Sequence, residues 1–176
     1  MLLAAVALAG DQPVKTVAKV DLKRYLGRWH EISSIPQWFQ KDCAYGVTAT
    51  YSLRADGDIG VLNQCRTADG SVKKAEGIAW VVDKNTNAKL KVSFIPGKLK
   101  ILGGDYWVID LGPDYEYAVV GHPDREYGWV LSRTPTLPKE TLDGIWARLK
   151  AQGYDLSQFK MTPQTPCQVE GKECGL

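Results

Sequence analysis

The chain has 176 residues, of which 44% are hydrophobic and 24% are charged, which is the size and balance of one globular domain. Its 22 lysines and arginines against 20 acidic residues give a formal charge of +2, too small and too scattered to indicate a nucleic-acid-binding surface. Aromatic side chains suit strands and glycine suits turns, so 17 glycines, 6 tryptophans and 8 tyrosines favour an all-β domain.

Residues 1–10 differ from the rest of the chain. They read MLLAAVALAG, an apolar run that is too short to span a bilayer and that ends in the small-x-small pattern of a signal-peptidase site. We interpret this run as the remnant of a signal peptide, although no basic residue precedes it, and we expect an exported protein. A helix or strand packed on the domain is the alternative interpretation.

From Gly27 onward, short apolar stretches alternate with turn-forming clusters about every ten residues, which is typical of a β-meander. We predict eight strands, at residues 27–35, 46–54, 59–65, 72–82, 88–94, 105–111, 115–121 and 127–133. Nearly every connection is short enough for a hairpin. In an up-and-down barrel the two longest connections, 36–43 and 95–104, would lie at the same end, together with 67–71 and 121–126.

One amphipathic helix is predicted at residues 138–153. Leu142, Ile145, Trp146 and Leu149 recur at helical spacing, and Gly153 is placed to end the helix. Since the apolar stripe is one-sided, we expect this helix to pack against the outer wall of the barrel. A short apolar segment follows at 156–161.

The chain has four cysteines, Cys43, Cys65, Cys167 and Cys174, without a C-x-x-C pair and with only two histidines. An even number of cysteines without metal-ligand spacing favours two disulfides in an oxidising compartment and no metal site. Four cysteines allow three pairings, and their spacing does not choose among them.

Three short motifs stand in register with the predicted strands. They are Tyr25-Leu26-Gly27-Arg28-Trp29 at the first strand, Asp114-Tyr115 before a later strand, and Ser132-Arg133-Thr134-Pro135 at the end of the last one. Together they resemble the three motifs of the lipocalin family, and the resemblance covers residues 20–167. Within the family, the amino-acid sequence at 47–53 and 129–135 is similar to that of bacterial lipocalins and their apolipoprotein D-like relatives.

The resemblance implies an eight-stranded antiparallel up-and-down β-barrel with one C-terminal α-helix packed outside. It also implies a barrel domain over 20–167 and a tail over 168–176 held by a disulfide. By analogy with apolipoprotein D-like members we expect Cys43 to pair with Cys167, which leaves Cys65 with Cys174. Periplasmic or outer-membrane association follows, but no cysteine precedes Cys43, so a lipid anchor is not supported.

The motif residues are expected to close one end of the barrel. Trp29 is large enough to plug it, Gly27 lets the chain cross there, and the planar guanidinium of Arg133 can cover the indole. Asp114 and Tyr115 would form a neighbouring corner, although the threonine that usually precedes this pair is absent. Direct contact of Trp29 or Arg133 with a ligand is the alternative.

Alternation along each strand predicts which side chains point into the barrel. Small residues among larger ones suggest unfilled volume, whereas a filled core is the alternative. The lining would be apolar with an isolated amide and tyrosine hydroxyls, which suits an alkyl or isoprenoid chain. The predicted ligand-binding residues are Val47, Ala49, Tyr51, Val61, Asn63, Ala79, Val81, Leu90, Val92, Phe94, Tyr106, Val108, Ala118, Val120, Tyr127, Trp129 and Leu131.

The loops at the predicted open end carry apolar tips and basic side chains. We expect Trp38, Lys41, Lys98, Lys100 and Arg125 to form one rim that meets anionic lipid head groups. Solvated lysines and a locally packed tryptophan are the alternative.

These features predict a carrier of fatty acids, lysophospholipids or similar small amphiphiles, which acts in envelope lipid transport, storage or repair. We expect no catalytic residue, no cofactor and no nucleic-acid partner. We do expect peripheral contact with a membrane surface, and a monomer or weak homodimer. One alternative is a lipocalin-fold isomerase or epoxide-modifying enzyme acting on a lipid or carotenoid, and another is a haem or tetrapyrrole binder. The sequence lacks the hydrolase, phosphate-loop and zinc-protease motifs, and His30 and His122 are poorly placed for iron. Strand acids such as Glu31 and Asp110 are expected to face solvent, and a pair formed by these two carboxylates is the alternative.

Overall fold

The computed structural model describes residues 12–95 and 100–171. Each predicted strand is present, with ends within two residues of the prediction. The strands are β1 (Gly27–Ser34), β2 (Tyr45–Leu53), β3 (Ile59–Arg66), β4 (Val72–Val81), β5 (Lys89–Ser93), β6 (Gly104–Leu111), β7 (Tyr117–Gly121), β8 (Gly128–Ser132) and a short β9 (Lys160–Met161). The helices are α1 (Leu22–Tyr25), α2 (Lys139–Ala151) and α3 (Pro166–Val169), with 3-10 turns η2 (Trp38–Gln40), η3 (Lys100–Leu102) and η4 (Leu156–Gln158).

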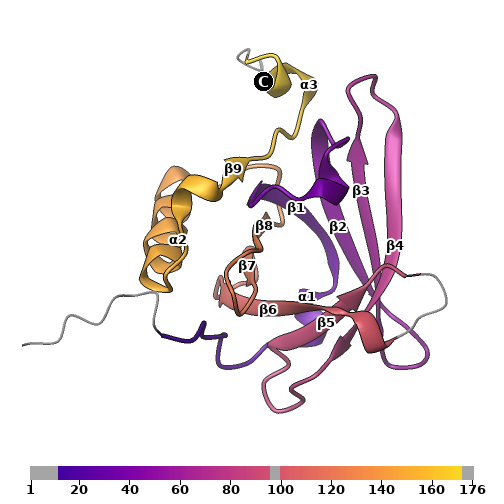
Figure 1. Ribbon diagram of the computed structural model, residues 1–176, viewed down its shortest axis with the longest axis vertical. Coiled ribbons are helices and arrows are strands. Elements are labelled where there is room, and N and C mark those ends of the chain that lie inside the picture. Colours follow the sequence, from indigo (N-terminus) through magenta and orange to yellow (C-terminus); the bar gives the residue numbers. More distant parts are fainter. Residues whose placement is uncertain (1–11, 96–99, 172–176) are drawn as a thin grey trace, which may run out of the picture.

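Strand β1 closes the barrel because it pairs with a different strand along each half. Its first half, from Gly27 to His30, lies antiparallel to β2, and its second half, from His30 to Ser34, lies antiparallel to β8. A register shift between Glu31 and Ser33 marks the bend between the halves. The other strands pair consecutively, and β9 adds to the end of β1, so the predicted eight-stranded up-and-down barrel is confirmed (Figure 1).

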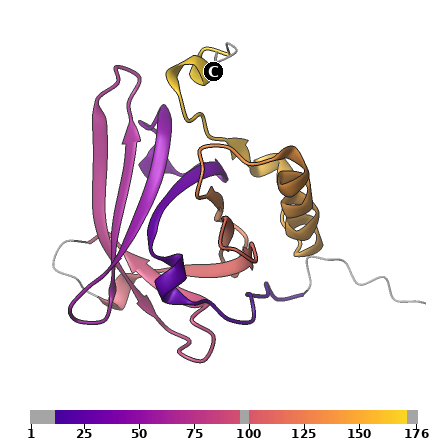
Figure 2. The same ribbon diagram turned by 180° about the vertical axis from the view of Figure 1, so that it is seen from behind.

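Helix α2 packs outside the barrel, as its apolar stripe predicts (Figure 2). Ile145 and Leu149 are fully buried in a cluster with the outward side chains of β6, β7 and β8, among them Val119 and Val130. Leu149 alone contributes about 2 kcal/mol by burial at this interface. Among the described residues, no helix is long and apolar enough to cross a membrane.

The closed end is built from the motif residues. Trp29 has no exposed surface, and its indole Nε1 donates to the carbonyl oxygen of Tyr25 at 2.9 Å. The guanidinium of Arg133 lies 3.7 Å from the centre of the indole and donates to the carbonyl oxygens of Arg24, Arg28 and Tyr115. One side chain thereby joins α1, β1 and the turn before β7.

Tyr115 differs from its predicted place in a strand. It has a φ of +60° and lies in the turn before β7, where its hydroxyl accepts from the backbone N–H of Asp21 at 2.8 Å. The Arg24 guanidinium lies over the Tyr115 ring, 4.2 Å from its centre. The backbone N–H of Asp114 donates to Glu116 in the same turn. These contacts connect the Asp114-Tyr115 motif to the segment that leads into β1.

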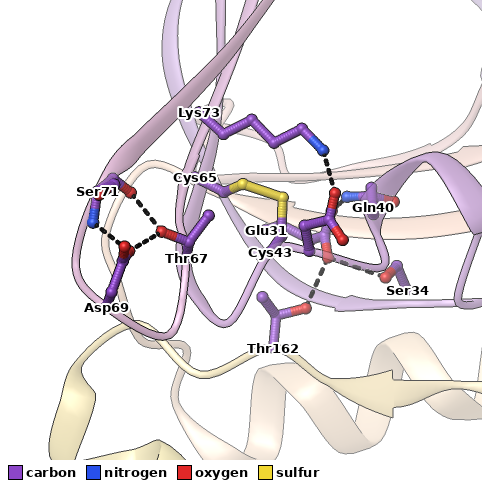
Figure 3. The surroundings of a disulfide bond; sticks show 11 residues. Glu31, Ser34, Gln40, Cys43, Cys65, Thr67, Asp69, Ser71, Lys73 and Thr162 are labelled. Atoms are coloured by element: carbon purple, nitrogen blue, oxygen red, sulfur yellow. Dashed lines mark hydrogen bonds and ion pairs between the residues drawn. A yellow bond between two sulfur atoms is a disulfide. The ribbon is translucent and has the colours of Figure 1, made fainter.

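The predicted disulfide pairing is wrong. Cys43 is bonded to Cys65, with their Cα atoms 5.5 Å apart, so neither Cys43–Cys167 nor Cys65–Cys174 exists (Figure 3). The cause is local, because the β2–β3 register places Tyr45 opposite Arg66 and brings the two flanking cysteines together. Cys167 is disulfide-bonded as well. Cys174 lies outside the described residues, as does the predicted signal-peptide remnant at 1–10.

Candidate functional site

A pocket of about 510 Å³ lies inside the barrel, within the usual range of sites for small ligands. Its wall is mostly apolar and comes from β1 to β8 together with α1 and η2. Most of the predicted inward side chains line it, namely Val47, Ala49, Tyr51, Val61, Asn63, Ala79, Leu90, Val92, Phe94, Tyr106, Val120, Trp129 and Leu131.

Four of the predicted residues lie elsewhere. Val108 and Ala118 are fully buried in the core at the closed end, and Val81 packs against that core. Tyr127 stacks on Trp129 with ring centres 6.0 Å apart and is not part of the lining. Val81, Val108 and Ala118 thus fill the barrel interior rather than line the pocket.

The pocket also contains residues that the prediction missed. Leu22, Tyr25 and Leu26 reach it from α1, and Phe39, Gln40 and Ile95 reach it from the connections at the mouth. Asp21 caps α1 by accepting from the backbone N–H groups of Lys23 and Arg24. This aspartate, a preferred N-cap residue, was the available signal in the sequence for the short helix that follows it.

Three tyrosine hydroxyls meet in the pocket wall. The Tyr106 hydroxyl lies 2.8 Å from that of Tyr25 and 2.9 Å from that of Tyr51. Burial raises the pKa of Tyr51 to about 12 and raises the pKa values of Tyr25 and Tyr106 as well. The three phenols are therefore neutral at physiological pH and give the apolar wall one polar spot.

Glu31 is buried, so the expectation that this strand acid faces solvent is wrong. It is 6% exposed and lines the pocket, and its carboxylate accepts from the Ser34 and Thr162 hydroxyls and from the Gln40 amide (Figure 3). Asp110 does face outward, since its carboxylate accepts from Arg148 of α2 at 2.6 Å. The two acids therefore do not form a pair.

The predicted basic rim is not assembled. Lys100 of η3 instead forms an ion pair with Asp58 at 2.7 Å, beside the β2–β3 turn. Arg125 donates to the carbonyl oxygens of Gln12 and Gln152, next to the end of α2. Lys98 lies outside the described residues, and Lys41 is exposed at the end of η2.

Other side chains surround the mouth instead. Trp38 and Phe39 of η2 line it and are 81% and 45% exposed, and Phe94 and Ile95 line it from the end of β5. The lysines that line it are Lys73 and Lys74 of β4. Lys73 forms an ion pair with Asp42 at 2.6 Å.

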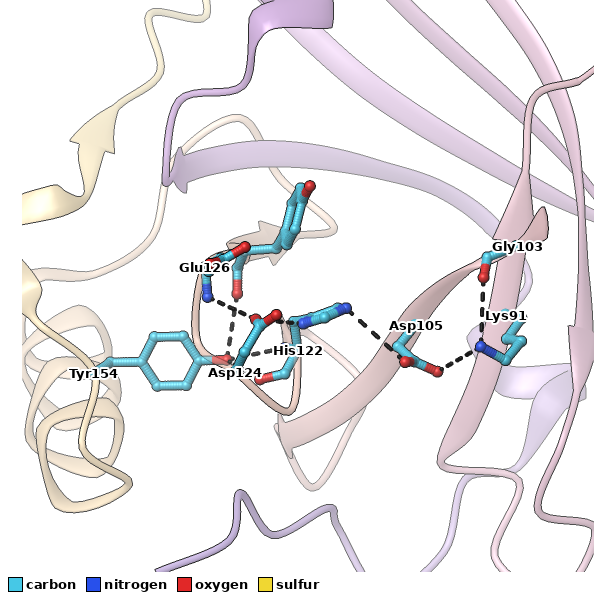
Figure 4. Close-up of polar contacts among 8 residues, drawn as sticks. Lys91, Gly103, Asp105, His122, Asp124, Glu126 and Tyr154 are labelled. Carbon is cyan, nitrogen blue, oxygen red and sulfur yellow. Dashed lines mark hydrogen bonds and ion pairs between the residues drawn. The ribbon is translucent and has the colours of Figure 1, made fainter. Parts of the chain in front are cut away.

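Neither histidine lines the pocket. His30 contacts the Gln164 side chain at 3.2 Å, outside the barrel wall. His122 is held between Asp124 at Nδ1 and Asp105 at Nε2, the latter 3.9 Å away and itself paired with Lys91 (Figure 4). The backbone N–H of His122 donates to the Tyr154 hydroxyl, so this cluster fixes the 122–126 turn. Within the described ranges, no three His, Cys, Asp or Glu side chains are grouped to hold a metal.

Comparison with known proteins agrees with this architecture. Residues 20–164 match the family model of the lipocalin-like domain. The chain is 42% identical over 147 residues to the outer membrane lipoprotein Blc of Escherichia coli K12, covering 83% of this chain and 80% of that protein. It is 37% identical over 158 residues to mouse apolipoprotein D, covering 84% and 78%.

A solved structure with the same fold is insecticyanin from the tobacco hornworm Manduca sexta. The TM-score is 0.69 at 24% identity, and the match covers 86% of this chain and 85% of that one. On the family match and the identity to these relatives, the chain belongs to the lipocalin family.

Proposed function

We propose that this protein is a non-catalytic carrier that takes one small amphiphile, such as a fatty acid or a lysophospholipid, into the barrel. The observation that carries the proposal is the apolar pocket of about 510 Å³ behind a mouth with a few polar groups. An alkyl chain along this wall gains about 0.8 kcal/mol for each buried CH₂, which corresponds to about a fourfold gain in affinity per methylene.

A binding role also agrees with the ionisable groups. Glu31 is a carboxyl group of the kind that an isomerase or epoxide-modifying enzyme would need in the pocket. Its hydrogen-bond partners Ser34, Gln40 and Thr162 are all neutral, however, and serve to hold it in place. A carrier is the simpler function for this arrangement.

The location of the carrier is proposed on separate grounds. Disulfides such as Cys43–Cys65 persist in oxidising compartments, and the E. coli relative is named an outer membrane lipoprotein. We therefore propose an exported, envelope-associated protein that serves lipid transport, storage or repair.

The mouth suggests how a ligand reaches the pocket. Exposed Trp38 and Phe39 beside Lys41 and Lys73 combine apolar tips with cations, as in proteins that touch lipid surfaces. We propose transient contact of this mouth with a membrane by the monomer or a weak homodimer.

Delipidated protein can be titrated with saturated fatty acids of 8 to 16 carbons, with fluorescence of the pocket residue Trp129 as the readout. Affinity should rise about fourfold per added CH₂ and then level off when the pocket is full. Affinity that does not depend on chain length, or no saturable change with any of the acids, would overturn the proposal. Mass spectrometry of an organic extract of the purified protein identifies the natural ligand.

A further inference from the structure

The mouth of the pocket contains hydrogen-bond acceptors that lack donors. Glu31 Oε1 accepts from Ser34 Oγ at 2.8 Å and from Thr162 Oγ1 at 2.7 Å, whereas Oε2 accepts only from Gln40 Nε2 at 2.9 Å. A carboxylate oxygen can accept two hydrogen bonds. Oε2 therefore keeps one open position.

Gln40 adds a second acceptor next to the first. Its amide must present the NH₂ group to the Glu31 carboxylate, because only that end can donate, and this fixes its carbonyl oxygen Oε1 as the free end. Gln40 Oε1 is buried and has no hydrogen-bond partner among the described residues. A buried acceptor in this state destabilises the protein unless something donates to it.

Asn63 supplies a third polar atom on the same pocket wall. Its Oδ1 is buried and lacks a partner in the part of the chain that the structure describes. Asn63 lies on β3, two residues before Cys65, and it is paired with Ala49 of β2. Gln40, Asn63 and Glu31 are therefore three polar residues in the lining of one pocket.

The charge of Glu31 also lacks a partner. No ion pair of Glu31 is found within residues 12–95 and 100–171, and its bonded neighbours are neutral. Of the two lysines that line the pocket, Lys73 is paired with Asp42. A buried carboxylate favours a cation that also donates hydrogen bonds.

We propose that the pocket selects amphiphiles with a primary ammonium head, whose N–H groups bind Glu31 Oε2 and Gln40 Oε1 while the alkyl chain lies along the apolar wall. An ammonium has three donors and no acceptor, which matches this set of groups. A carboxylate head would face Glu31 with like charge and would leave Gln40 Oε1 unsatisfied. This inference rests on the proposed carrier function and narrows its ligand class.

The test compares head groups at constant chain length. Dodecylamine, dodecyltrimethylammonium, dodecanol and dodecanoate are titrated below their micelle concentrations into delipidated protein, with Trp129 fluorescence as the readout. Dodecylamine should bind about tenfold or more tighter than dodecanol and dodecanoate. Dodecyltrimethylammonium keeps the charge but has no N–H donor, so it should lose most of that advantage.

Variants locate the preference. Glu31→Gln should reduce the affinity for dodecylamine to that for dodecanol measured on the same variant, with a circular dichroism spectrum like that of wild type as the sign that the barrel is intact. Gln40→Met, in the η2 segment, tests the same subsite without altering β1 and should lower the ratio of dodecylamine to dodecanol affinity severalfold. Glu140→Gln, the same charge change on exposed α2, should alter none of the four affinities.

The outcomes separate this inference from the carrier function. Equal affinity for dodecylamine and dodecanoate, or a preference that survives both Glu31→Gln and Gln40→Met, would overturn the inference and leave the carrier intact. Binding of none of the four probes would overturn both. If the inference holds, two lysophospholipids with the same acyl chain distinguish the source of the ammonium head. Tighter binding of the ethanolamine lipid than of the choline lipid indicates that the natural ligand is a lipid, whereas equal binding of the two indicates a free amine.

Discussion

Arg133 is predicted to be the largest single polar contribution to stability at the closed end. Its guanidinium covers Trp29 at 3.7 Å and donates to three backbone carbonyls, those of Arg24, Arg28 and Tyr115. Arg133→Met keeps the packing of the stem and removes all four interactions. The cation–π contact contributes about 1 kcal/mol and each charge-assisted bond, discounted for partial exposure, about 0.5–1 kcal/mol. We therefore expect a loss of about 3 kcal/mol in the free energy of unfolding.

The assay is urea unfolding of the oxidised protein, followed by tryptophan fluorescence and circular dichroism, with an unchanged slope as a sign of two-state behaviour. For a chain of this size, the same loss lowers Tm by about 6–12 °C. Arg28→Met is the matched control, since Arg28 is an exposed neighbour on β1, and its effect should stay within about 0.5 kcal/mol. An Arg133→Met variant as stable as this control would refute the assignment of Arg133 as the clamp of the closed end.

Two further predictions concern the disulfide and the tyrosines. Replacing Cys43 and Cys65 together by Ala should destabilise the protein by about 3 kcal/mol, because their disulfide closes a loop with a sequence separation of 22 residues; equal urea midpoints of variant and oxidised wild type would contradict this. Tyr51, with a folded-state pKa raised to about 12 by burial, favours the folded state fully below pH 10, and this contribution should decline as pH rises from 10 toward 12. In an absorbance titration at alkaline pH, Tyr25, Tyr51 and Tyr106 should ionise only as the protein unfolds, and their ionisation in the folded protein would contradict the buried cluster.

Patterns that repeat along the chain predicted the barrel and most of its lining. Strand alternation correctly placed Val47, Ala49 and Tyr51 inside the barrel, because one face of each strand must point to the interior. That rule needs no knowledge of tertiary contacts. The same rule failed for Val108 and Ala118, since it identifies the inward face but not the level at which the barrel is filled.

Features that depend on contacts between distant segments were missed. Lys100 forms an ion pair with Asp58, 42 residues away in the sequence, and neither residue alone indicates that contact. Glu31 is buried because its oxygens accept hydrogen bonds from Gln40, in the turn after β1, and from Thr162, 131 residues away in the sequence. The pairing of Cys43 with Cys65 followed from the β2–β3 register, which the resemblance to apolipoprotein D-like proteins did not supply.

The central claim is that the barrel interior holds the ligand, and a variant that fills the interior tests it most directly. Ala79 lines the pocket and is 4% exposed, so Ala79→Phe places a ring in that space, whereas Ala151→Phe adds the same ring on the exposed end of α2. Native mass spectrometry of the delipidated proteins with a dodecyl amphiphile should show one bound molecule in wild type and Ala151→Phe and almost none in Ala79→Phe. Equal loading of all three proteins would contradict binding inside the barrel.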